Sequence, residues 1–234
     1  MENISKIADK IIILDNQSDD GTYEKVIKHD KVICKRSNLD FFKYEQYLFA
    51  ELWSLVRKHA KNEDMILLLS SDEFVDDNLI KNKDELISNS GKTIYFLHLV
   101  NMWDKDNFRI DNQWGYRLTS RLFRFIDTDF MEWRSLRKGI HNTFFPSYVK
   151  SFYYKAGILN SCLIHYGYSD INIRKRKFEA YFDVSEKKDK VMVSSMMDSN
   201  PQLIKLDKLK KLMKNYNIML SKQEWNEIKR LILN

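Results

Sequence analysis

A short apolar run that ends in two acidic residues most constrains how this chain can fold. Residues 65–69 read Met-Ile-Leu-Leu-Leu, with polar residues on both sides. Five apolar residues are too few for a helix, so the run predicts a strand buried on both faces, in the middle of an α/β sheet. Ligands of open α/β sheets bind outside the carboxyl ends of the strands. Asp72 and Glu73, which follow the run, are therefore candidates for holding a metal ion or a phosphate.

A second stretch near the amino terminus has the same arrangement. Residues 11–14 read Ile-Ile-Ile-Leu and lead into a polar turn that starts at Asp15 and contains Gly21. As strands of one sheet, the two runs would bring Asp15 and Asp72 to the same edge. Asp72 and Glu73 are adjacent acids, and such acids repel each other unless a divalent cation or a basic group lies between them. The alternative for this pair is a solvated acidic turn.

Hydrophobic patterns predict the other elements of the chain. From about residue 185 we expect helices, with Ser221 and Glu224 forming a capping box. Thr22 and Ser169 are predicted helix caps, and His98 is interpreted as a core histidine. The remaining predicted strands are residues 31–34, 92–103 and 155–165, and the predicted helices are 40–59 and 76–88.

Several motifs resemble one enzyme family. Residues 15–22 read Asp-Asn-Gln-Ser-Asp-Asp-Gly-Thr and residues 70–73 read Ser-Ser-Asp-Glu. These turns resemble family 2 glycosyltransferases of the GT-A fold, in which a strand ends in Asp-Asp-Gly-Ser-Thr-Asp-Gly-Thr and a later one in Asp-x-Asp. Arg-Leu-Phe-Arg at 121–124, Gly-Ile-His-Asn at 139–142 and His-Tyr-Gly at 165–167 resemble its bacterial lipopolysaccharide-type branch. Ser70 replaces the first acid of Asp-x-Asp, and Asn142 replaces a glutamate.

The resemblance implies both a fold and an activity. The expected fold is a GT-A-like domain over residues 1–168, with a mixed, mainly parallel sheet flanked by helices, and a helical C-terminal extension over residues 169–234. The expected activity is transfer of a sugar from a nucleotide sugar, a uridine diphosphate sugar being favoured, to a hydroxyl of a glycan, a lipid-linked saccharide or a protein, with inversion. Polysaccharide biosynthesis is the implied setting.

The resemblance also implies a donor site with a Mn²⁺ or Mg²⁺ ion. The metal ligands would be Asp72, Glu73 and His141, although His141 alone fits a structural role as well. Lys35 and Arg36 follow a predicted strand, and Arg174 and Lys177 lie in a basic helix, so each is either a diphosphate contact or an ordinary surface charge. The full set of expected donor contacts is Asp15, Asn16, Ser18, Lys35, Arg36, Ser71, Asp72, Arg174 and Lys177.

The acceptor side of the expected site is assigned from its aromatic and acidic residues. Arg109, Trp114 and Trp133 are the expected acceptor contacts, because aromatic rings stack on sugars and charged groups bind hydroxyls. The alternative for residues 104–114 is a solvated hairpin with one packed tryptophan. Asp111 and Glu132 are the candidates for the general base, with Asp111 favoured.

Composition sets outer limits on the class of protein. An apolar fraction of 44% indicates a folded chain, and a net charge of +6 favours anionic partners. Cys34 and Cys162 are too few for a disulfide framework, which indicates a reducing compartment. No apolar run reaches 18 residues, so we expect a cytoplasmic protein, or one in peripheral contact with the inner face of a membrane.

Two other classes of function compete with the enzyme. The first is a degenerate, non-catalytic relative that still binds a nucleotide or a glycan; the family strand that precedes residues 1–9 is missing here, so the chain is a fragment, a shortened variant or completed by another subunit. The second is a nucleic-acid-binding protein, which we do not favour because no recognition motif is present. The C-terminal helices would pack on the domain or form a homo-oligomer.

Overall fold

The computed structural model describes the chain except residues 90, 129–145, 147, 150–154, 184 and 186. It is a mixed α/β protein, as predicted, and helices flank its mixed sheet. In chain order the elements are α1 (Glu2–Ser5), β1 (Ile11–Asp15), α2 (Thr22–Val26), β2 (Val32–Arg36), α3 (Phe41–Arg57), β3 (Met65–Leu67), β4 (Glu73–Val75), α4 (Asp77–Asn89), β5 (Ile94–Asn101), β6 (Asn107–Arg109), η1 (Asn112–Trp114), β7 (Arg117–Arg124), β8 (Ala156–His165), α6 (Ile171–Phe182), α7 (Lys187–Ser195), β9 (Leu203–Lys205), α8 (Leu206–Met213), β10 (Met219–Leu220) and α9 (Lys222–Leu233).

The contacts divide the chain into two compact units. Unit 1 comprises residues 1–65 and 124–152, and unit 2 comprises residues 66–123 and 153–234. The expected division at residue 168 does not follow these units, because α6 to α9 belong to the same unit as β5 and β8.

Unit 1 contains the first acidic turn. β1 pairs in parallel with β2 over five residues, from Ile11 opposite Val32 to Asp15 opposite Arg36. Helix α3 contacts β1, and its first turn is capped by the carboxylate of Asp40. The predicted strands and helix are thus confirmed, except that the residue capping α2 is Gly21 rather than Thr22.

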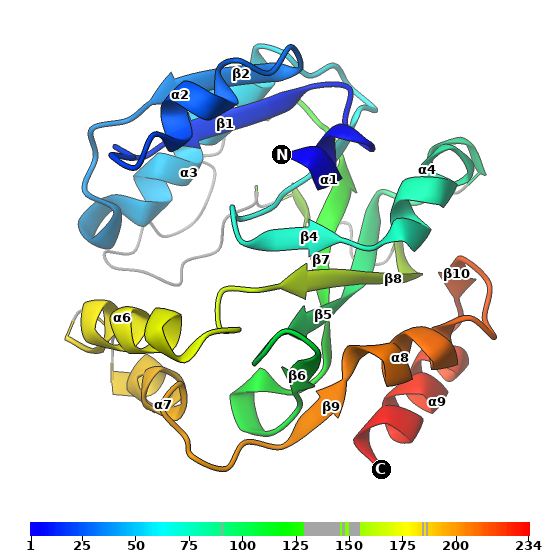
Figure 1. Cartoon of the computed structure of the whole chain (residues 1–234). Helices are drawn as coiled ribbons and strands as arrows, with labels where there is room; N and C mark the ends of the chain where they lie inside the picture. Colours follow the sequence, from blue (N-terminus) through cyan, green and yellow to red (C-terminus); the bar gives the residue numbers. More distant parts are fainter. Residues whose placement is uncertain (90, 129–145, 147, 150–154, 184, 186) are drawn as a thin grey trace. The chain divides into compact units, whose positions relative to one another are not determined.

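Unit 2 is built on a six-stranded sheet with the order β10-β8-β5-β7-β3, in which β4 also pairs with β8 (Figure 1). β5 and β8 are parallel, whereas β5–β7, β4–β8 and β10–β8 are antiparallel. The prediction of a mainly parallel sheet is therefore wrong for the pairings described.

The position of β3 also differs from the prediction. β1 and β2 form a two-stranded sheet of their own, so β1 and β3 are not strands of one hydrogen-bonded sheet in the described part of the chain. β3 lies at the end of the strand order, and its three residues are only half-buried. The prediction of a central strand buried on both faces is wrong, because an edge strand leaves part of its surface uncovered.

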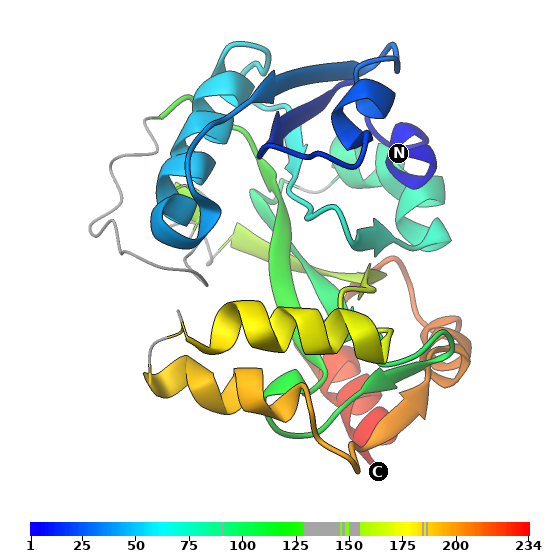
Figure 2. The ribbon, with the colours of Figure 1, turned by 60° about the vertical axis from the view of Figure 1, so that its left-hand side comes forward.

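The C-terminal helices close the core of unit 2. Leu209 of α8 and Ile228 and Ile232 of α9 are fully buried together with Val100 of β5. Burial of each such side chain contributes about 1.5–3 kcal/mol. In Figure 1, α8 and α9 lie side by side, and in Figure 2, α6 and α7 do the same. The prediction of a purely helical C-terminal extension is wrong. The extension also contains two strands, because β9 pairs with β6 and β10 pairs with β8.

Local predictions in this core are confirmed. Ser221 and Glu224 form the capping box at the start of α9. His98 is fully buried, and its ring contacts the hydroxyl of Tyr116 through Nδ1 and the edge of Trp225. Burial lowers the pKa of His98 from 6.5 to about 4, so this core histidine is neutral at physiological pH.

Candidate functional site

The second acidic turn lies against the His-Tyr-Gly turn at the end of β8. β4 and β8 are antiparallel neighbours, with Glu73 opposite His165. Tyr166 N donates a hydrogen bond to Asp72 O at 2.9 Å, and Met102 N donates to His165 O at 2.9 Å. The register between β4 and β8 therefore brings together residues that are far apart in the sequence.

The side chain of Asp72 is the centre of a polar cluster in unit 2. Its Oδ2 lies 3.0 Å from Nζ of Lys177 and 3.3 Å from Nε2 of His165. The other ring nitrogen of His165, Nδ1, lies 2.9 Å from Oδ1 of Asn101, which fixes the orientation of the ring. Burial alone would raise the pKa of Asp72, but the contacts with His165 and Lys177 lower it well below its usual range.

Gly167 lets these three side chains meet. A Cβ atom at this position would lie less than 3.0 Å from Asp72 Oδ2, Lys177 Nζ and His165 Nε2 at once. The groups therefore converge on the space that any larger residue at position 167 would fill, and we name them, with Gly167, the Asp72 cluster.

Helix α6 is held in place beside the Asp72 cluster by Arg174, one turn before Lys177. Its Nη1 donates to Trp103 O at 2.8 Å and to Tyr168 O at 2.5 Å, and its guanidinium lies 4.5 Å from the centre of the Trp103 ring. Nζ of Lys177 lies 4.7 Å from the centre of the Tyr168 ring. Arg174 thus positions Lys177, and Asp170, not Ser169 as predicted, caps the helix.

Glu73, a predicted metal ligand, has other partners. It is buried, its Oε1 accepts a hydrogen bond from Arg121 Nη2 at 2.9 Å, and its Oε2 accepts one from Ser70 N at 2.8 Å. These contacts favour a structural role, in which Arg121 neutralises the acid adjacent to Asp72. Ser71, a predicted donor contact, is exposed.

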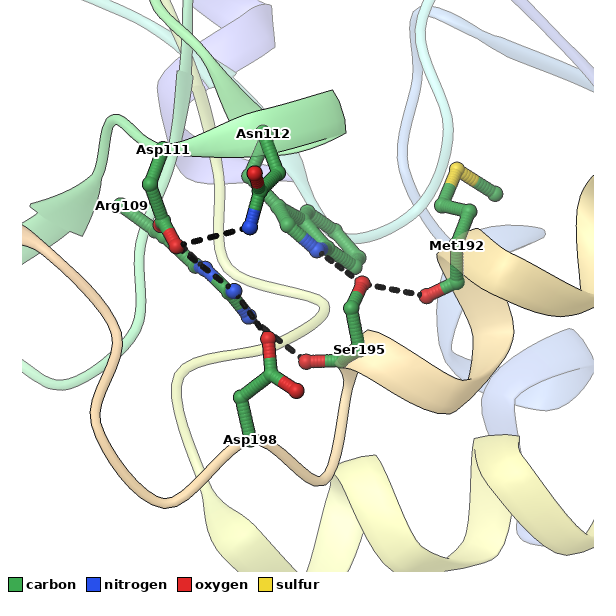
Figure 3. A network of polar contacts seen from close by, with 7 residues as sticks. Arg109, Asp111, Asn112, Met192, Ser195 and Asp198 are labelled. Atoms are coloured by element: carbon green, nitrogen blue, oxygen red, sulfur yellow. Dashed lines mark hydrogen bonds and ion pairs between the residues drawn. The ribbon is translucent and has the colours of Figure 1, made fainter.

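Arg109 and Asp111, two of the residues predicted to bind and deprotonate the acceptor, form a polar network around a buried guanidinium (Figure 3). Arg109 is fully buried, and its Nε and Nη2 donate to the two carboxylate oxygens of Asp111 at 2.5 and 2.9 Å. Arg109 also donates to Ser195 O at 2.6 Å and contacts the carboxylate of Asp198. The network ties the end of α7 to the loop after β6.

Trp114 completes this network as a packed side chain. It is buried, its Nε1 donates to Ser195 Oγ at 2.7 Å, and its ring packs against Trp103 and Tyr168. The alternative of a hairpin with a packed tryptophan is therefore favoured over an acceptor surface at Arg109 and Trp114. Asp111 is engaged with a cation, which disfavours it as a general base.

In unit 1 Asp15 is paired with Arg36. The buried carboxylate accepts hydrogen bonds from Arg36 Nε at 2.9 Å and from Ser18 N at 3.3 Å, and Arg36 Nη2 donates to Ser18 O at 2.6 Å. Burial would raise the pKa of Asp15, but these hydrogen bonds lower it. Three residues predicted to bind the donor, Asp15, Ser18 and Arg36, are thus hydrogen-bonded to one another.

Two other residues predicted to bind the donor, Asn16 and Lys35, also contact groups of the protein itself. Asn16 Nδ2 donates to Leu39 O at 2.8 Å, and Lys35 Nζ lies 2.5 Å from Glu51 Oε1. Asp15 and Asp72 belong to different units, so their predicted meeting at one edge stays a prediction.

Three predicted site residues, Glu132, Trp133 and His141, lie outside the described residues. His165 and Gly167 were not predicted as site residues. The signal for them was a histidine that ends a strand and precedes a glycine turn and a basic helix, together with the pairing of that strand to the acidic turn.

Comparisons of this chain with protein-family models, with curated proteins and with solved structures gave no match. Within the described residues, no helix combines the length and the apolar character that crossing a membrane requires. The described residues also contain no group of three or more His, Cys, Asp or Glu side chains arranged to hold a metal ion.

Proposed function

We propose that this chain is a glycosyltransferase that transfers a sugar from a nucleotide sugar, of which uridine diphosphate sugars are the first to test, to a hydroxyl acceptor on a glycan, a lipid-linked saccharide or a protein. The observation that carries the proposal is the contact between Asp72 and His165. Each belongs to a separate motif that resembles the same family, and the β4–β8 register makes the motifs neighbours. The GT-A fold is part of this proposal.

The Asp72 cluster has the chemistry needed to receive a diphosphate. Transfer releases a nucleoside diphosphate, whose negative charge must be stabilised as the bond to the sugar breaks. The Lys177 ammonium can donate hydrogen bonds to phosphate oxygens, and Nε2 of the His165 ring can ligate a metal ion beside them. Their side chains are 22% and 14% exposed, so the cluster is partly open to solvent.

Two side chains of this cluster would hold a divalent cation. Asp72 Oδ2 and His165 Nε2 converge over Gly167, where a Cβ would intrude, whereas Glu73 is held by Arg121. One carboxylate and one imidazole are enough when substrate phosphates complete the coordination, and an imidazole favours Mn²⁺ over Mg²⁺. Such an ion would neutralise the charge of the leaving diphosphate.

The proposal is tested by calorimetry with a panel of nucleotide sugars in the presence of Mn²⁺, followed by an assay for release of sugar and nucleotide. The wild type should bind one donor and turn it over. Asp72→Asn should lose both activities, whereas Asp207→Asn, the same change at an exposed residue of α8, should keep them.

Binding without turnover would favour the non-catalytic relative as the second candidate function. The observation that favours it is the ion pair of Asp111 with Arg109, which disfavours Asp111 as the general base. Absence of nucleotide binding in the wild type would contradict both functions.

A further inference from the structure

We propose that Lys177 is a built-in counter-cation of the Asp72 cluster that competes with a divalent metal ion for Asp72 and His165. The metal role of these residues rests on the proposed function, but the competition concerns the protein alone. It makes the cluster a cation site with two alternative occupants, an ammonium group and a metal ion.

The geometry leaves room for one cation only. Lys177 Nζ is 3.0 Å from the same Asp72 oxygen that lies 3.3 Å from His165 Nε2. All three atoms lie less than 3.0 Å from the position of a hypothetical Cβ on Gly167. A metal ion at this point would be within a few ångströms of the ammonium, and like charges at that distance repel strongly in a partly desolvated site.

Lys177 can yield the position without moving the helix. Its flexible four-carbon stem can carry the ammonium away from Asp72, while Arg174 keeps α6 fixed through Trp103 O and Tyr168 O. In its present position Nζ also lies 4.7 Å from the centre of the Tyr168 ring, a cation–π contact that adds to the hold on the ammonium until a stronger anion draws it away.

The competition has a consequence for substrate binding. A bound diphosphate attracts the Lys177 ammonium. When the ammonium leaves Asp72, the carboxylate is free to bind the metal ion. Metal and nucleotide should therefore bind cooperatively, each raising the affinity of the other by the same factor. The free protein should bind the metal weakly.

The test is a titration of the full chain with Mn²⁺ in the absence of nucleotide, followed by electron paramagnetic resonance of the free ion. Lys177→Met should bind Mn²⁺ about tenfold more tightly than the wild type, because the repelling charge is gone. Lys175→Met, at an exposed position of the same helix, should leave the affinity unchanged. Adding Asp72→Asn to Lys177→Met should abolish the gain.

Equal Mn²⁺ affinity in the wild type and Lys177→Met would overturn the inference, as would lack of measurable binding in both. Lys177→Gln provides a second variant without the charge, and far-ultraviolet circular dichroism checks folding. A tenfold gain in Mn²⁺ affinity without any nucleotide binding would contradict the proposed function while supporting the competition. Nucleotide binding without a gain in Mn²⁺ affinity would support the proposed function and contradict the competition.

Discussion

Asp72 and His165 lie 3.3 Å apart, joined across the β4–β8 pair in which Glu73 is opposite His165. This relationship converts two short sequence motifs into one polar cluster. The expectation was that Asp72 and Glu73 ligate one metal ion together. In the structure His165 is the neighbour of Asp72, and Glu73 forms an ion pair with Arg121.

Gly167→Ala should damage the Asp72 cluster. The new methyl group would lie less than 3.0 Å from three polar side chains, so they must move apart. We expect a loss of about 1–3 kcal/mol in the free energy of unfolding and a weaker affinity for Mn²⁺. Urea unfolding and metal titration measure the two effects. Wild-type values for both would show that the three groups do not need the close approach.

Asp111→Asn should act on stability more than on chemistry. The change weakens the two hydrogen bonds that the carboxylate accepts from the buried Arg109, and it leaves Asp198 as the remaining acidic partner. We expect a loss of about 1–3 kcal/mol in the free energy of unfolding. Urea denaturation measures it, with Asp207→Asn as the exposed control. A general base would instead show unchanged stability and a collapse of turnover.

His98 should make stability depend on pH below neutrality. Burial lowers its pKa from 6.5 to about 4, so between these values the unfolded chain binds a proton that the folded chain does not. The free energy of unfolding should therefore be highest above about pH 6.5 and fall by about 3 kcal/mol as the pH drops to 4.

His98→Gln tests this origin. The variant should be less stable than the wild type at pH 8, where the packing against Tyr116 and Trp225 is disturbed, but its stability should change less between pH 6.5 and 4. Denaturation at several pH values gives both numbers. An unchanged pH dependence in the variant would assign the effect to other groups.

Ser221→Ala should destabilise the start of α9. The hydroxyl accepts a hydrogen bond from Glu224 N at 3.2 Å, and the Glu224 carboxylate accepts one from Ser221 N at 2.7 Å. Loss of the cap should cost about 1 kcal/mol of unfolding free energy. Ser199→Ala, at an exposed position outside the helices, is the control. Equal midpoints of thermal unfolding for the two variants would contradict the prediction.

The elements that could be predicted from the sequence are those specified by local patterns. The apolar runs that became β5 and β8 were recognised because they extend over eight and ten residues. The cap at Ser221 marks a helix start through hydrogen bonds with a residue three positions away, and the caps predicted at Thr22 and Ser169 lie one residue from the observed ones, Gly21 and Asp170. Such signals are independent of the rest of the fold.

Strand order and side-chain partners could not be predicted in this way. Nothing near residue 65 indicates that β3 is an edge strand, because its place depends on pairing with distant segments. Likewise, the sequence around Asp111 does not show that Arg109 is buried against Ser195, far along the chain, and holds the Asp111 carboxylate. His165 was missed for the same reason, since its contact with Asp72 arises from the register between two strands.

The central claim is that the Asp72 cluster receives the phosphates of a nucleotide sugar. A crystal structure of the chain with uridine diphosphate and Mn²⁺ tests it most directly. We predict the ion between Asp72 and His165 and the diphosphate in contact with Lys177. A nucleotide bound away from Lys177, or an ion bound away from Asp72 and His165, would contradict this role of the cluster.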